Sequence, residues 1–261
     1  SAQLRDIYGM LIDGMQGERG KLRSGGDGGA AFARVARVRA LIGPGDGRDN
    51  PVRTHFANAD YADREPSVGA QMECFTNTID GLKGETSLAN SAAVLWHRNA
   101  LGDWVRPGIM LHGISPSGVY KDIAHANLHA VMTFTSRIIA IQELNSGDGV
   151  GYGSRYRATK PTRIGVIACG YADGYPRHAK DGTPVWVYAD NPSDSCTCPI
   201  AGQVSMDMIT IDLTNAPWAQ VGTKVELWGK NLPVDDVAAH AQTIGYELVC
   251  AIAPRVPVEV V

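Results

Sequence analysis

The sequence has no long apolar run and no strong excess of charge of one sign. None of its hydrophobic stretches approaches the roughly 18 residues that a membrane-spanning helix requires, and we expect no signal peptide. The formal net charge is −3, and the basic residues are scattered along the 261 residues. We therefore expect neither a membrane nor a nucleic acid as a partner.

Cysteine is scarce, and its spacing shows no pairs of the kind that hold metals. The five cysteines form an odd number. Cys196 and Cys198 are too close for the usual zinc knuckle, and no second pair or histidine partner follows them. We therefore predict no metal site, and we expect reduced thiols in a cytoplasmic protein.

The composition is that of an ordinary globular protein. Apolar residues make up 44% and charged residues 20% of the chain. A chain of this length can bury a substantial core and can form one large domain or two smaller ones.

The first half of the chain has a βα pattern after an irregular start. Residues 17–29 are rich in glycine, which favours a loop, and the alanine-rich segment 30–41 predicts a helix. Strands then alternate with helical periodicity, and polar residues stand at the strand ends. The expected elements are a strand at 52–60, a helix at 65–80, a strand and turn at 86–93, and a strand at 105–111. This alternation predicts part of a (β/α)₈ barrel, whose strand ends form the active face.

Near residue 130 the pattern changes to β-branched runs separated by turn residues. The expected strands are 131–141, 164–169, 185–188, 204–213 and 225–228, followed by a helix at 234–242 and a last strand at 246–256. Short strands without intervening helices predict an antiparallel β domain. We therefore predict a partial barrel at 1–129 and a β domain at 130–261.

Three glycine-punctuated motifs stand out within residues 149–212. They are GVGYG at 149–153, GYADGYPR at 170–177 and GQVSMDM at 202–208. Each glycine turn delivers aromatic or charged side chains, which is how a β-rich domain presents functional groups on its loops. Two further blocks precede them, SLANSAA at 87–93 and WVRPGIMLHG at 104–113.

The order and composition of these blocks resemble the alanine racemases that use pyridoxal 5′-phosphate, over roughly residues 50 to 261. The resemblance implies an α/β plus all-β fold, with the C-terminal part of a (β/α)₈ (TIM-like) barrel followed by an antiparallel β domain. It implies interconversion of L-alanine and D-alanine, which supplies D-alanine for peptidoglycan. It also implies a homodimer in which one subunit provides a tyrosine and the other a lysine to each site.

The resemblance implies that five residues bind the cofactor: Asn90, Ser91, Arg106, Gly108 and Ile109. The Ser91 hydroxyl and the backbone N–H groups near Gly108 and Ile109 would bind the phosphate. Arg106 would donate to the pyridine nitrogen and, because a guanidinium stays charged, would leave that nitrogen unprotonated. Without the resemblance, Asn90 and Ser91 indicate a helix cap and Arg106 a surface residue.

Two residues match the family's groups beside the cofactor ring. Tyr152 matches the catalytic tyrosine that exchanges the α-proton on one face. A phenol is a weak acid, so it needs a neighbour to exchange protons at neutral pH. His55 matches a histidine near the ring that could provide this tuning, although a single histidine at a strand end is more often a satisfied core residue.

Other matches concern the substrate. Met206, through its backbone N–H, and Arg19 match contacts to the substrate carboxylate, although Arg19 lies in a disrupted copy of its motif and is otherwise a solvated loop residue. The matches to the channel through which substrate enters are Tyr171, Arg177 and Asp60, with Asp173 as further polar lining.

The sequence lacks the lysine motif of the family. Racemisation needs an electron sink for the α-carbon, which pyridoxal phosphate provides from a Schiff base with a lysine. The family carries that lysine in a motif like Val-Lys-Ala-Asn-Ala-Tyr-Gly, and none of the seven lysines here lies in such a context. Since the chain also opens on Ser1 rather than Met, we expect a fragment that is inactive by itself.

Two other hypotheses remain open. A non-catalytic dimerisation or binding module derived from a racemase would account for the missing lysine. A broad-specificity amino-acid racemase would use the same chemistry, although the blocks at 104–113 and 171–177 favour alanine racemase. A serine hydrolase is excluded because no Gly-x-Ser-x-Gly elbow is present.

Overall fold

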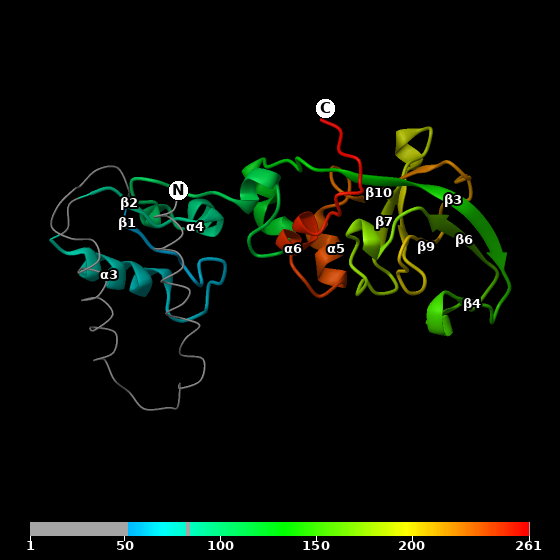
Figure 1. Cartoon of the computed structure of the whole chain (residues 1–261), viewed down its shortest axis with the longest axis horizontal. Helices are drawn as coiled ribbons and strands as arrows, with labels where there is room; N and C mark the ends of the chain where they lie inside the picture. Colours follow the sequence, from blue (N-terminus) through cyan, green and yellow to red (C-terminus); the bar gives the residue numbers. More distant parts are fainter. Residues whose placement is uncertain (1–51, 82–83, 261) are drawn as a thin grey trace, which may run out of the picture. The chain divides into compact units, whose positions relative to one another are not determined.

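The computed structural model describes residues 52–81 and 84–260. Helices and strands carry the labels of Figure 1. Arg19, the glycine-rich segment 17–29 and the helix expected at 30–41 lie outside the described residues.

The segment from residue 52 to residue 113 contains a short parallel βαβ unit. Strands β1 (Val52–Arg53) and β2 (Thr86–Ser87) pair in parallel, with Val52 opposite Thr86. Helix α3 (Val68–Ile79) connects them, as a parallel pair requires a crossover. Its first turn is capped by Ser67, whose side chain accepts a hydrogen bond from the N–H of Ala70. The helix expected at 65–80 is therefore confirmed.

Helix α4 (Ser91–Trp96) follows β2 directly, and short 3₁₀ helices come after it. They are η1 (Arg98–Ala100), η2 (Ile109–His112) and η3 (Tyr120–Ala126). A small core joins α3, α4 and the β strands, made of Phe56, Ala59, Val68, Phe75, Leu88, Ala89, Ala92, Ala93 and Ala100. Burying each large apolar side chain stabilises the fold by about 1.5–3 kcal/mol.

A six-stranded antiparallel sheet forms the second half of the described chain (Figure 1). Its strands are β3 (Phe134–Leu144), β6 (Thr162–Ile167), β7 (Pro184–Val187), β8 (Cys196–Pro199), β9 (Ile209–Asp212) and β10 (Lys224–Trp228), in the order β8-β7-β10-β3-β6-β9. The pair β4 (Gly149–Val150) and β5 (Tyr156–Arg157) forms a separate hairpin. A bridge between Ile200 and Ile211 connects the two ends of the six-stranded sheet, which is therefore nearly closed.

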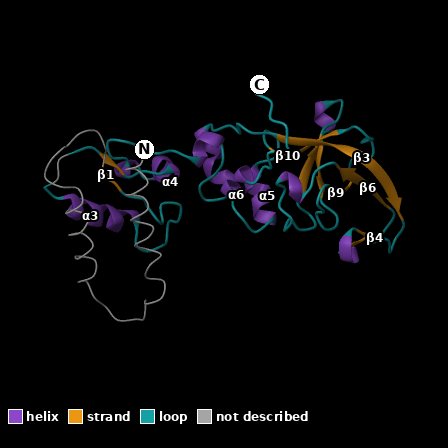
Figure 2. Ribbon diagram, viewed as in Figure 1, coloured by secondary structure: helices purple, strands orange, loops and turns teal. Residues whose placement is uncertain are grey.

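Alternating β-branched residues fill the core of this domain. Successive side chains of a strand point to opposite faces of the sheet. Ile167, Val185 and Ile209 point to the inner face and are fully buried. The aromatic part of the core centres on Trp228, whose ring stacks on Tyr175 at 5.8 Å and tilts against Phe134 at 4.8 Å. Helices α5 (Val234–His240) and α6 (Gly245–Cys250) follow strand β10 (Figure 2).

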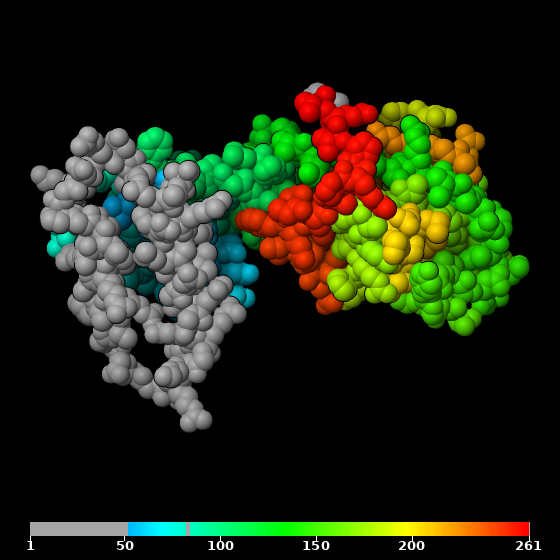
Figure 3. All heavy atoms as spheres, in the orientation of Figure 1, coloured from blue at the N-terminus to red at the C-terminus, as the bar shows by residue number. Residues whose placement is uncertain are grey.

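Two predicted strands are wrong. The segment expected as a strand at 246–256 forms α6 and then irregular backbone, which lies on the surface of the domain (Figure 3). A short apolar run cannot distinguish a strand from a helix, and here the helix buries Leu248 against the core. The segment 105–111 forms irregular backbone and η2, and the preceding residue, Trp104, makes an isolated bridge to Ser87.

The remaining strand predictions are confirmed with shifted ends. The strand expected at 52–60 contains only the two residues of β1, and the run at 204–213 contains only β9. The run at 131–141 begins three residues later and extends to Leu144. The boundary between the domains at residue 130 stays a prediction.

Candidate functional site

The N-termini of α4 and η2 meet at Ser91. This residue is buried and begins α4, and its hydroxyl oxygen accepts hydrogen bonds from the backbone N–H groups of Gly108 at 2.9 Å and Met110 at 3.3 Å. Gly108 is the N-cap of η2, and Ile109 is its first residue. Since the first N–H groups of a helix have no partner within it, donors and a hydroxyl converge here in a way that suits an anion.

The guanidinium of Arg106 is held by backbone and side-chain acceptors. Its Nη1 donates to the carbonyl oxygen of Ser87 at 2.8 Å and to the Ser87 hydroxyl at 2.6 Å, and its Nη2 donates to the carbonyl oxygen of Thr54 at 2.6 Å. The Arg106 backbone N–H donates to Ala89 at 2.8 Å. These bonds join the ends of β1 and β2 and fix the direction of a permanent positive charge.

His55 lies within the electrostatic reach of Arg106. The pKa of His55 is lowered, first because surrounding atoms displace part of its water and second because of the Arg106 charge, while the carboxylate of Asp60 acts in the opposite direction. The lowered pKa favours a neutral imidazole, which can accept a proton or a hydrogen bond.

Asn90 stabilises the turn that leads into α4 through two side-chain hydrogen bonds. Its side-chain oxygen accepts from the N–H of Ala93 at 3.0 Å, and its amide group donates to the carbonyl oxygen of Phe56 at 3.4 Å. The cap that the sequence alone indicates is therefore present, and it connects the segment after β1 to the start of α4.

Tyr152 begins the 3₁₀ helix η4 (Tyr152–Ser154), at the tip of the β4–β5 hairpin. Its side chain is 76% exposed. Among residues 52–81 and 84–260, no group forms a hydrogen bond with its hydroxyl. The preceding Gly151 has a φ of +68°, which favours glycine because it has no Cβ. The described part of the chain thus presents this phenol to its surroundings without a partner.

The loops that carry Tyr171 and Met206 are joined through their backbones. The Tyr171 N–H donates to Ser205 at 3.0 Å and the Ala172 N–H donates to Met206 at 2.9 Å. A Cβ at Gly170 would lie 2.3 Å from the carbonyl oxygen of Met206, so this close approach requires glycine. The side chains of Tyr171 and Met206 are exposed.

Arg255 binds both of these loops. Its Nε donates to Asp173 at 2.7 Å and its Nη2 donates to Asp207 at 2.7 Å. The second oxygen of Asp173 accepts from the N–H of Gly170 at 2.9 Å. Sequence reasoning did not assign Arg255 a role, because its partners lie 82 and 48 residues away and no local pattern indicates them.

The candidate residues thus lie in two groups, in two parts of the described chain. His55, Asn90, Ser91, Arg106 and Gly108 belong to the first group, which lies between residues 54 and 110. The second group, in the β domain, contains the loops of Tyr152, Tyr171, Arg177 and Met206. Arg177 is exposed and contacts this group through its backbone oxygen, which accepts from Gln203 at 2.7 Å.

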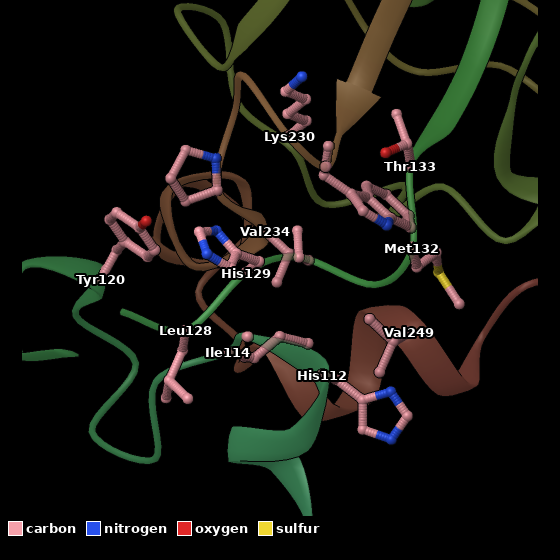
Figure 4. A pocket seen from close by; sticks show the side chains of 15 residues that line it. His112, Ile114, Tyr120, Leu128, His129, Met132, Thr133, Lys230, Val234 and Val249 are labelled. Atoms are coloured by element: carbon pink, nitrogen blue, oxygen red, sulfur yellow. The ribbon is translucent and has the colours of Figure 1, made fainter. Parts of the chain in front are cut away.

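A cavity of about 300 Å³ lies elsewhere, between the segment 112–133 and residues 228–249 (Figure 4). Its walls include His112, Tyr120, His129 and Lys230 next to aliphatic side chains. Neither Ser91 nor Arg106 lines it, so the cavity is not the cofactor site that the sequence predicts. Within the described ranges, no group of three or more His, Cys, Asp or Glu residues is placed to hold a metal ion.

Comparison with known families covers almost the whole chain. Residues 20–116 match the family model for the alanine racemase N-terminal domain, and residues 131–260 match the model for the alanine racemase C-terminal domain. The chain belongs to the alanine racemase family. The resemblance seen in the sequence and the predicted fold class, a partial TIM-like barrel followed by an antiparallel β domain, are therefore confirmed.

Individual alanine racemases are similar over most of this chain. The alanine racemase of Burkholderia mallei (strain SAVP1) is 55% identical over 225 residues, which are 86% of this chain and 60% of the relative. The crystal structure of the biosynthetic alanine racemase from Pseudomonas aeruginosa has a TM-score of 0.77 at 43% identity and covers 91% of this chain and 63% of that one.

A third alanine racemase, from Bartonella henselae with covalently bound pyridoxal phosphate, has a TM-score of 0.72 at 27% identity and covers 90% of this chain and 62% of that one. The chain therefore spans less than two thirds of the length of these relatives. The roles of the individual site residues stay predictions.

Proposed function

We propose that this chain forms the larger part of a pyridoxal phosphate-dependent alanine racemase, which interconverts L-alanine and D-alanine and supplies D-alanine for peptidoglycan. The observation that carries the proposal is the donor set around Ser91 and Arg106, in a chain 55% identical to an alanine racemase. The bacterial relatives support a cytoplasmic location. Among the described residues, no helix is long and apolar enough to cross a membrane.

The residues fit pyridoxal phosphate in the described part of the site. Ser91 and the N–H groups of Gly108 and Ile109 would hold the phosphate, because the buried Ser91 oxygen already converges with the Gly108 N–H at 2.9 Å. Arg106 would donate to the ring nitrogen, with Asn90 nearby. When bound, the cofactor supplies an electron sink for charge at the α-carbon.

Tyr152 would remove or return the α-proton on one face of the substrate. Its exposed and unpartnered phenol suits a site that a second subunit completes, which supports a homodimer. The other residues of this chain would act on the substrate: the backbone N–H of Met206 and the side chain of Arg19 would bind the alanine carboxylate, and Tyr171, Arg177 and Asp60 would line the channel.

A second candidate function is a non-catalytic dimerisation module. The observation that favours it is the absence of the family's lysine motif from these 261 residues. Under the leading proposal, the chain needs that lysine from additional sequence of the kind that its longer relatives carry. The chain by itself would then not racemise alanine.

A chimera distinguishes the two functions. The part of the Burkholderia relative that precedes the matched region is joined to the start of this chain, so that Arg19 is kept, and formation of D-alanine from L-alanine is measured. We expect activity, and we expect Tyr152→Phe to lower kcat by about 10²–10⁴-fold, the range for a lost general acid or base. Tyr156→Phe, at a half-buried phenol that donates to Asp212 at 3.4 Å, is the control. A folded dimeric chimera that binds pyridoxal phosphate but makes no D-alanine would support the non-catalytic module.

A further inference from the structure

Arg155 comes directly after η4 and forms the centre of a hydrogen-bond network. Its Nη2 donates to the carbonyl oxygens of Gly202 at 2.8 Å and Ala179 at 3.2 Å, and its Nη1 donates to the side chain of Gln203 at 2.9 Å. Its Nε and Nη2 also donate to one oxygen of Asp181, at 3.3 and 3.0 Å. A single planar guanidinium therefore binds four residues from two other segments.

These segments carry the other proposed site residues of the β domain. Gln203, which accepts from Arg155, donates through its Nε2 to the carbonyl oxygen of Arg177 at 2.7 Å. Asp181 accepts from the N–H of Gly202 at 2.8 Å, so the two segments are also joined to each other. Gln203 and Met206 lie in the same loop. The network thus connects the segment after Tyr152 to the loops of Arg177 and Met206.

Tyr152 has little support of its own. It stands between Gly151 and Gly153, both with positive φ, and its side chain is 76% exposed. Glycine allows the backbone more freedom than any other residue, so the position of the phenol depends on what holds the two ends of η4. The short β4–β5 pairing and the hydrogen bonds of Arg155 restrain these two ends.

We infer that Arg155 is a positioning residue for racemisation: it fixes η4 to the loops of Arg177 and Met206 and so sets where the Tyr152 phenol stands. The inference rests on the proposed function. A lysine cannot replace Arg155, because an ammonium has no planar fork with which to bind acceptors in several directions.

The first test uses the chain as it is and does not need activity. Hydrogen exchange of the Ser154 backbone amide, which donates to the carbonyl oxygen of Gly151 at 3.2 Å, is measured in the wild type, in Arg155→Ala and in Arg157→Ala. Arg157 is the matched control, since it is exposed and its guanidinium donates, among the described residues, to the carbonyl oxygen of Gly147 alone, at 3.1 Å. We expect exchange at least about 10-fold faster in Arg155→Ala and unchanged in Arg157→Ala, as a lost local anchor requires. Unchanged exchange in Arg155→Ala would overturn the inference, and so would equal acceleration throughout the domain.

The second test measures kinetics in the chimera. We expect Arg155→Ala to lower kcat by about 100-fold, the typical effect of a misplacement of about 1 Å, and we expect Arg155→Lys to remain impaired. Added methylguanidine should restore part of kcat in Arg155→Ala and none in Tyr152→Phe, whereas a purely structural defect would show no rescue. If Arg155→Ala does not fold, Gln203→Ala removes one acceptor and gives the same test in a milder form. An inactive wild-type chimera would count against the proposed function, while the exchange data would still decide whether Arg155 anchors η4.

Discussion

The carboxylate of Asp235 accepts a 3.1 Å hydrogen bond from the backbone N–H of Ser115, which lies 120 residues earlier in the chain. Asp235 is in the first turn of α5 and is buried, and its second oxygen has no hydrogen-bond partner among the described residues. Burial raises the pKa of Asp235 to about 6, with a smaller rise from Asp236, although the Ser115 bond acts against it. A single carboxyl group thus connects the turn after η2 to α5 in surroundings that disfavour its charge.

The raised pKa of Asp235 predicts that the free energy of unfolding falls as the pH rises from about 4 to about 7. The folded protein keeps the proton up to a pKa of about 6, whereas the unfolded chain releases it near the ordinary value of 3.8. The stabilisation is therefore complete below pH 3.8 and is lost as the pH passes 6. The difference corresponds to roughly 3 kcal/mol. Urea unfolding at several pH values should show a flatter profile for Asp235→Asn, with Asp190→Asn, at an exposed carboxylate that is not among the causes of the shift, as the control. An unchanged profile would assign the slope to another group.

The proximity of Arg106 and His55 predicts a second measurable shift. Because the guanidinium contributes to the lowered pKa of His55, removing its charge in Arg106→Gln should raise that pKa. Proton NMR titration of the His55 ring in this chain measures the change, and His55→Gln identifies the signal. Arg98→Gln is a matched control, since Arg98 is not among the causes of the lowered pKa. Equal titration in Arg106→Gln and wild type would contradict the prediction.

The close approach of Gly170 to Met206 predicts that Gly170→Ala displaces the loop at 205–208. The added Cβ would meet backbone atoms at 2.3 Å, and such overpacking typically costs about 1–3 kcal/mol. Urea unfolding measures the loss, and in the chimera the KM for alanine should rise because Met206 moves. Gly69→Ala is the control: its Cβ would meet nothing within 4 Å in helix α3, so it should stabilise the chain by about 0.5–1 kcal/mol. Equal free energies of unfolding for the wild type and Gly170→Ala would contradict the prediction.

Glu226 is fully buried in β10 and accepts four hydrogen bonds. One oxygen accepts from the N–H groups of Asn231 and Leu232, and the other accepts from the Tyr188 hydroxyl and the Asn231 side chain. In Glu226→Gln the new NH₂ group faces the Tyr188 hydroxyl and the Asn231 side-chain amide, which then have no acceptor. We therefore expect the free energy of unfolding to fall by roughly 2–4 kcal/mol. Tyr188→Phe removes one donor and should cost about 1 kcal/mol. Chemical denaturation at pH 7 compares them, and equal losses would show that the unpaired donors do not dominate.

The sequence predicts the elements whose pattern is local. The β-branched runs at 164–169, 185–188 and 225–228 become β6, β7 and β10, because alternating side chains can be buried only on one face of a strand. The strand predicted at 246–256 is wrong, because a short apolar run is compatible with a helix as well as with a strand. Its few apolar residues fit either period, and only the packing of Leu248 in the core decides for a helix.

The same distinction between local and long-range patterns applies to the residues of the candidate site. Motifs indicate Tyr152, Ser91 and Arg106, since each stands in a block of recognisable residues. The residues that hold these motifs in place cannot be found in this way: Arg155 and Arg255 reach partners in distant segments, and a charged residue in a loop resembles any solvated residue until the fold brings its acceptors together.

The bridge between Ile200 and Ile211 has a consequence for how the protein behaves at high concentration. It links the β8 end of the sheet to β9, so the two outermost strands are turned toward each other instead of presenting long open edges to neighbouring molecules. Open strand edges are templates for aggregation. The near closure of the six-stranded sheet should therefore keep the β domain dispersed at high concentration.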